Sequence, residues 1–202
     1  MYPVRVPPHE PTLLSDPAAL KALANPVRQR ILQQLALCGP ATSTTLARDL
    51  GITSGGTSYN LRVLAEHGFV EEVPERARGR ERWWRRASRD VRLPLHFAPD
   101  DPSQATVEEI ARLWFAADVE LLERYLAERA DLPNWAHLPP YSRGDIQVDP
   151  AEYATFFEEY LALLRRYQHP AGQASPETRT VLVRLLAHPV PGLVPRAEEP
   201  RQ

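Results

Sequence analysis

The sequence of 202 residues contains one cysteine, Cys38, and one lysine, Lys21. A single cysteine excludes an intramolecular disulfide framework and any metal or iron–sulfur site built from several thiolates. The sequence has no apolar run near the roughly 20 residues that cross a bilayer, and its first residues lack the apolar core of a signal peptide. We therefore expect a globular, cytoplasmic protein in which Cys38 is a small buried side chain at a helix end.

Net charge is also nearly absent, since the chain carries a formal charge of −2 at pH 7. Taken alone, this value argues against a nucleic-acid partner. The charges are unevenly distributed, however: residues 20–92 hold 13 basic and 7 acidic side chains, whereas residues 93–202 hold 10 basic and 17 acidic ones. A basic half joined to an acidic half indicates that one half meets a polyanion and the other does not.

Proline is missing from residues 41–73, 103–132 and 151–169, although the chain has 21 prolines. These stretches should hold the regular structure, because a proline inside a helix costs about 3 kcal/mol. The sequence therefore predicts five segments. They are an N-terminal arm (1–15), a basic domain (16–92), a linker (93–103), an acidic domain (104–188), and an irregular tail (189–202).

Capping residues predict the helices of the basic half. Asp16 and Asn25 are suited to the N-cap, and each precedes a proline that fits the first helical position. They predict helices over residues 17–24 and 26–38, the second of which ends before a glycine.

Two further helices follow after Thr42 and Thr53, which can each serve as an N-cap. The first ends at Gly51, a residue suited to the left-handed C-cap, and the second ends at Gly68. Two short helices joined by a tight glycine turn are the signature of a helix-turn-helix.

Beyond Gly68 the pattern changes to strands over residues 69–73 and 81–87, joined by an arginine-rich loop over residues 74–80. A helix-turn-helix followed by a basic β-hairpin is a winged helix. The predicted fold is thus mainly helical with a small β component. It comprises an N-terminal winged helix-turn-helix domain, a long dimerisation helix and a small α+β C-terminal domain.

The predicted DNA-binding residues lie on the second helix of the helix-turn-helix and on the wing, because that helix enters the major groove and arginine suits phosphate or a narrow minor groove. Thr57 is the least secure of them, since it lies four residues before the inward-facing Leu61. Taken separately, a solvated loop and ordinary capping also explain these patterns; their combination favours DNA. The set is Ser54, Gly55, Gly56, Thr57, Ser58, Tyr59, Asn60, Arg62, Arg76, Arg78, Arg80 and Arg82.

Residues 23–32 (LANPVRQRIL), 46–53 (LARDLGIT) and 58–70 (SYNLRVLAEHGFV), followed by the arginine wing, resemble the ArsR-type winged-helix transcription regulators. The resemblance implies a homodimer on a two-fold DNA operator, usually a repressor that an effector releases. Metal-sensing members carry a Cys-x-Cys pair at the start of the third helix, where this chain has residues 42–44 (TST). We therefore expect no metal and no cofactor here.

The acidic half begins with a long amphipathic helix over residues 104–130, which we assign to dimerisation. Packing within its own subunit is the alternative. A strand over residues 141–148, a helix over 150–169 and a strand over 179–187 are predicted to follow. Aromatic side chains here could line an apolar effector pocket or simply fill a core: Trp114, Trp135, Tyr153, Phe156, Phe157 and Tyr160.

No catalytic residue is predicted, because the sequence has no phosphate-cradling glycine loop, nucleophile elbow or metal dyad. The adjacent carboxylates Glu158 and Glu159 should point in different directions on a helix. A homodimeric, DNA-binding transcription regulator, with double-stranded DNA as its partner and without membrane contact, is the favoured function. A winged-helix protein-interaction adaptor is the alternative.

Overall fold

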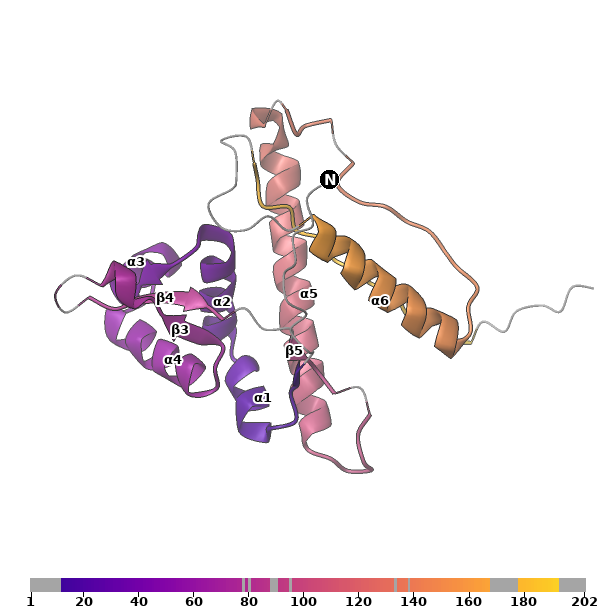
Figure 1. Cartoon of the computed structure of the whole chain (residues 1–202), viewed down its shortest axis with the longest axis horizontal. Coiled ribbons are helices and arrows are strands. Elements are labelled where there is room, and N and C mark those ends of the chain that lie inside the picture. The colour runs from indigo at the N-terminus through magenta and orange to yellow at the C-terminus, as the bar shows by residue number, and fades with distance from the viewer. Residues whose placement is uncertain are drawn as a thin grey trace, which may run out of the picture. The chain divides into compact units, whose positions relative to one another are not determined.

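The computed structural model describes residues 12–77, 79, 81–87, 91–94, 96–132, 134–137, 139–167 and 178–192. The chain divides into two compact units, residues 1–166 and 167–202. The described residues of the second unit form neither helix nor strand. All helices and strands named below belong to the first unit (Figure 1).

The four helices predicted from capping residues are confirmed as α1 (Pro17–Leu23), α2 (Pro26–Cys38), α3 (Ser43–Leu50) and α4 (Ser54–Glu66). Each N-cap side chain accepts a hydrogen bond from a backbone N–H of the first turn; the four caps are Asp16, Asn25, Thr42 and Thr53. These bonds satisfy donors that a helix leaves unpaired at its start, which is why the starts could be predicted from sequence.

A three-stranded antiparallel sheet follows the order β2–β4–β3. Strands β3 (Val70–Glu72) and β4 (Trp83–Arg86) are the predicted hairpin, and the short helix η1 (Pro74–Arg76) begins the loop between them. Strand β2 (Ala41–Thr42) was not predicted; it pairs with β4 just before α3 begins. We call β3, β4 and the segment between them the wing.

A second pair of strands was also missed by the sequence. Strand β1 (Thr12–Leu13) runs parallel to β5 (Val91–Arg92), and the backbone N–H of Leu14 donates to the carbonyl of Arg92 at 2.8 Å. The end of the predicted N-terminal arm is therefore fixed to the segment that follows the wing. Two-residue strands carry no readable period, so this pairing has no sequence signal.

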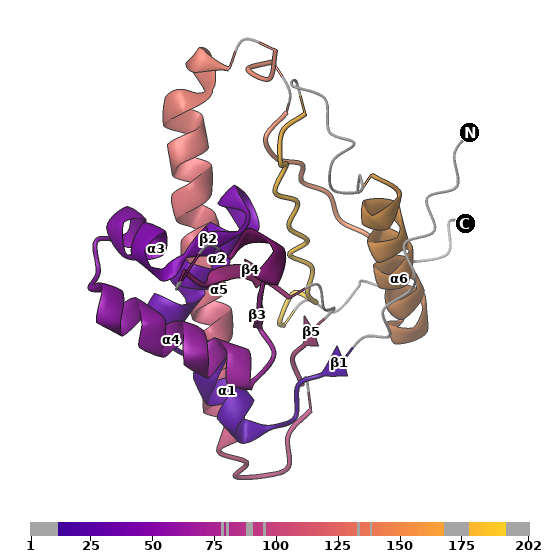
Figure 2. The ribbon, with the colours of Figure 1, turned by 60° about the vertical axis from the view of Figure 1, so that its left-hand side comes forward.

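The hydrophobic core lies between α1, α2, α3, α4 and the wing, and its centre is fully buried at Leu20, Ile31, Leu46, Leu61 and Leu64. Helix α5 (Ser103–Glu128) passes alongside α1 and α2 (Figure 2) and adds Val107 and Ile110 to the same core. The predicted linker over residues 93–103 thus does not separate two cores.

The acidic half departs from the predicted α+β arrangement. Helices α5, η2 (Arg129–Asp131) and α6 (Pro150–Arg166) are present, but residues 141–148 and 179–187 form no strand. Both segments are largely exposed, and two strands alone are marginal without a surface to pack on. The helix predicted over residues 150–169 was expected to end at residues 168–169, which lie outside the described residues.

Cys38 corrects another prediction, because it is exposed at the last residue of α2. Its spacing from Leu35 and Ile31 matches the buried face, but the core does not extend to this end of the helix. Among the described residues, none of the helices combines the length and apolar character that a membrane span requires.

Candidate nucleic-acid interface

Helix α4 is connected to α3 by a turn that Gly51 begins, with φ at 65° in the left-handed region. Leu61 and Leu64 fix the inner face of α4 in the core. On its other side, Ser54, Gly55 and Arg62 are exposed, and Tyr59 is 58% exposed. Together these residues form an exposed surface on α4.

Thr57 lies apart from this surface, which corrects its inclusion among the DNA contacts. It is 0% exposed, and its hydroxyl donates to the backbone carbonyl of Thr53 at 3.0 Å. The spacing of four and seven residues from Leu61 and Leu64 places it on their face of the helix. Thr57 therefore supports the start of α4 from within.

Asn60 is half-buried, and its side chain is already engaged on the protein. Its amide nitrogen donates to the Gly56 carbonyl at 2.9 Å, and its amide oxygen accepts from Nη1 of Arg28 at 3.5 Å. Arg28 on α2 also donates to the carbonyls of Lys21 and Ala22 at the end of α1. Burial lowers the pKa of the Arg28 guanidinium below its ordinary value. Asn60 thus links α4 to the domain as well as lining the candidate surface.

The two glycines at the start of α4 have different surroundings. A Cβ at Gly55 would meet nothing within 4 Å, whereas one at Gly56 would lie 3.0 Å from the capping Oγ1 of Thr53. The backbone N–H of Gly56 donates to that same oxygen at 3.2 Å. A side chain at Gly56 would therefore crowd the capping oxygen, and Gly55 leaves an open approach to the backbone.

The wing arranges its arginines against its own strands. The guanidinium of Arg76 lies 5.6 Å from the ring centroid of Trp83, and Trp84 is buried, because successive side chains of a strand point to opposite faces. Arg82 forms an ion pair with Glu72 at 3.2 Å. Arg78 and Arg80 lie outside the described residues.

Arg85 on β4 is an exposed cation that was not among the DNA-binding residues predicted from the sequence. Its Nε donates to Oε1 of Glu71 at 2.7 Å, and this bond raises the pKa of the Arg85 guanidinium. Two arginines directly follow the two tryptophans in the sequence, and this pair could have indicated a further basic position on the wing. It was predicted only as part of the strand over residues 81–87.

The six aromatic residues predicted to line an effector pocket are distributed over separate elements. Trp114 of α5 donates from Nε1 to Oε1 of Gln29 on α2 at 2.9 Å, and the backbone carbonyl of Trp135 accepts from the Tyr125 hydroxyl at 3.3 Å. The other four share α6, where Tyr153 packs near Phe156 and Phe157 near Tyr160.

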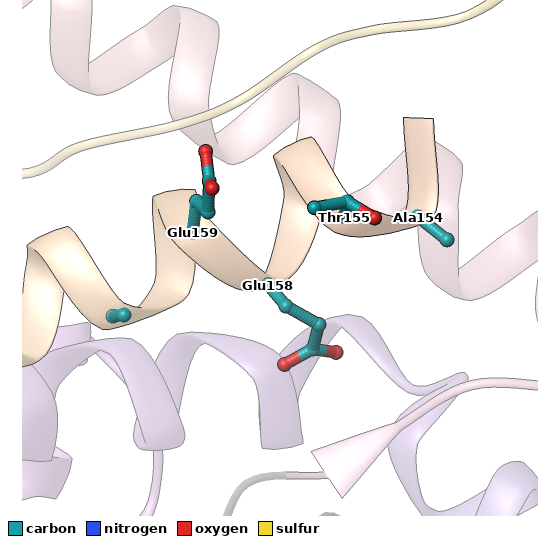
Figure 3. Close-up of a pocket in the computed structure, with 5 residues that line it drawn as sticks. Ala154, Thr155, Glu158 and Glu159 are labelled. Atoms are coloured by element: carbon teal, nitrogen blue, oxygen red, sulfur yellow. The ribbon is translucent and has the colours of Figure 1, made fainter. Parts of the chain in front are cut away.

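An open depression on α6 contains none of these six residues; it is lined by Ala154, Thr155, Glu158, Glu159 and Ala162 (Figure 3). Figure 3 also shows the carboxylates of Glu158 and Glu159 on different sides of the helix, as adjacent helical residues require. Glu158 pairs with Arg92 at 2.9 Å, so it joins α6 to β5. Among the described residues, no group of three or more His, Cys, Asp or Glu side chains could hold a metal ion.

Two helices joined by a glycine turn and followed by an antiparallel hairpin define a winged helix-turn-helix domain, the fold of DNA-binding transcription regulators. Residues 23–73 match the family model described as a helix-turn-helix domain, which confirms the helix-turn-helix part of this assignment.

Several solved structures are similar to the chain. A fragment of a possible transcriptional regulatory protein from Mycobacterium bovis is 27% identical, with 50% of this chain and 88% of that chain covered and a TM-score of 0.33. A homodimeric winged helix-turn-helix DNA-binding domain from the same organism, described as a possible ArsR-family regulator, is 25% identical (63% and 85% covered, TM-score 0.32). Reduced HlyU from Vibrio cholerae is 24% identical (48% and 85% covered, TM-score 0.31). The search of curated proteins gave no match.

Proposed function

We propose that this protein is a sequence-specific DNA-binding transcription regulator that acts as a homodimer. The observation that carries the proposal is the exposed polar face of α4 beside a wing with exposed arginines, within residues 20–92 that hold 13 basic and 7 acidic side chains. Arg62 and Tyr59 are the outward side chains best suited to a base edge or a phosphate in the major groove. The α4 segment from residue 54 to residue 65 contains no acidic residue, which disfavours the adaptor alternative.

Dimerisation is supported by a second apolar face on α5. Phe115, Val119, Leu122 and Leu126 are all exposed, by 39% to 58%. Their spacing of four, three and four residues places them on one stripe, and this heptad spacing suits packing against another helix. Val107 and Ile110 face the core instead, so one side of α5 completes the domain and another is available to a second copy of the chain.

The same proposal includes repression of transcription by the bound dimer and its release from the operator by a small apolar effector. A dimer that covers its operator blocks access to the promoter, and the resemblance to ArsR-type regulators favours this sign of regulation. The half-buried aromatic side chains along α6 are the group best suited to contact an apolar effector.

The test is selection of bound sequences from a pool of random duplexes with the full-length protein, followed by affinity measurements on the selected duplex. Arg62→Ala should weaken binding by about 5- to 150-fold if Arg62 reads a base. Arg124→Ala, which removes the same charge from the exposed side of α5, is the matched control and should bind like the wild type.

If Arg62→Ala loses the same affinity for selected and unselected duplexes, Arg62 contacts a phosphate rather than a base. Absence of wild-type binding to every duplex at low salt would contradict the proposed function.

A further inference from the structure

The wing carries two ion pairs that the proposed function does not use. Oε1 of Glu72 lies 3.2 Å from Nη1 of Arg82, and Oε1 of Glu71 lies 2.7 Å from Nε of Arg85. Both glutamates lie on β3, and their partners lie on β4 and just before it. Each pair therefore joins the two sides of the hairpin.

The register of the hairpin explains the pairing. Glu71 is directly opposite Arg85, and Glu72 is opposite Trp84, which places it diagonally from Arg82. Directly opposite and diagonal residues of an antiparallel pair are both within reach of long side chains. The backbone thus holds each carboxylate beside its arginine.

All four side chains remain accessible to a ligand. The side chains of Arg82 and Glu72 are 68% and 45% exposed, and those of Arg85 and Glu71 are 49% and 48% exposed. Exposed ion pairs are weak, because water solvates both partners. A phosphate of the DNA backbone can therefore take the place of the carboxylate, but a carboxylate that stays nearby repels it.

We propose that Glu71 and Glu72 compete with DNA phosphates for Arg85 and Arg82, and so lower the affinity of the wing for duplex DNA. This inference rests on the proposed DNA-binding function. It makes the two glutamates determinants of affinity although neither contacts DNA.

The experiment measures binding of the full-length protein to a mixed-sequence duplex of about 30 base pairs, by fluorescence anisotropy over a series of salt concentrations. Glu72→Gln and Glu71→Gln remove the charge but keep the shape of each side chain. Glu81→Gln is the matched control: it removes the same charge from the wing, and Glu81 has no ion pair among the described contacts.

We expect Glu72→Gln and Glu71→Gln each to bind about threefold to fivefold more tightly than the wild type at low salt, and Glu81→Gln to change binding less. The salt dependence should become steeper by up to about one unit for each arginine released. The gain from Glu72→Gln should vanish when it is combined with Arg82→Ala, since the effect acts through that arginine.

Two results would overturn the inference and leave the proposed function intact. One is a gain in affinity for Glu72→Gln that is no larger than that for Glu81→Gln, and the other is a gain that persists when Glu72→Gln is combined with Arg82→Ala. Failure of the wild type and of all variants to bind the duplex would overturn both. Circular dichroism and thermal unfolding of each variant exclude a folding defect as the cause of any difference.

Discussion

At the scale of single residues, hydrogen bonds between neighbours in the chain could be predicted from the sequence, whereas tertiary contacts could not. The caps at Thr42 and Thr53 involve atoms within three residues along the chain, so their bonds could be predicted from sequence. The partners of Arg28 on α1 and α4 could not, because they lie up to 32 residues away. Thr57 is a different case, because its spacing of four residues from Leu61 already indicated the inner face of α4, where the structure buries it.

The glycines at positions 51 and 55 should respond to alanine in opposite ways. Gly51 has a φ of 65°, so Gly51→Ala should destabilise the domain by about 1–2 kcal/mol. Gly55 lies in α4 with open space around it, so Gly55→Ala should stabilise the domain by up to about 1 kcal/mol. Denaturant unfolding of both variants measures the difference, and shifts of the same sign would contradict it.

Gly55→Ala also tests how closely DNA approaches α4. If the backbone at Gly55 lies against the duplex, the variant should bind DNA more weakly in spite of its greater stability. Unchanged binding would place the duplex farther from the helix start.

At the scale of elements, α5 was predicted as a helix but only part of its role was foreseen. The period of its apolar residues predicts an amphipathic helix without specifying which residues face the domain and which face a partner. The structure divides them, since Ile110 is 0% exposed in the core while Phe115 is 58% exposed. In the proposed dimer, folding and dimerisation therefore use different residues of one helix.

Substitutions on the two faces of α5 should separate these roles. Ile110→Ala should destabilise the domain by about 2–5 kcal/mol, because it opens a cavity in the core. Leu122→Glu should leave the helical content native but yield a monomer, as measured by analytical ultracentrifugation, because it places a charge within the apolar stripe. Ala127→Glu on another side of the helix is the matched control and should remain dimeric. A dimeric Leu122→Glu would reject the assignment of this face.

At the scale of the whole molecule, the uneven distribution of charge is the property that favours DNA. The total of −2 would place the protein among weak nucleic-acid binders, yet residues 20–92 hold 13 basic and 7 acidic side chains. Affinity for a duplex depends on the basic side chains that reach phosphates rather than on the sum over the chain.

Duplex binding should therefore depend strongly on salt. If each wing neutralises about three phosphates, a dimer should give a slope of log K against log salt of about −5. The monomeric Leu122→Glu variant should give about half that slope. Anisotropy titrations between low and physiological salt measure both values, and a slope near −1 for the wild type would contradict the role of the wing.

The sequence by itself determined the order and the first residues of the four N-terminal helices and the presence of the hairpin, because caps, glycine stops and strand alternation act between neighbouring residues. Only the tertiary structure decided that α5 begins inside the winged-helix core and that β3 glutamates hold two wing arginines. In the structure, residues 141–148 and 179–187 do not form the strands that the sequence predicted. These outcomes depend on which distant segments meet, and burial and pairing between distant residues leave no local pattern to read.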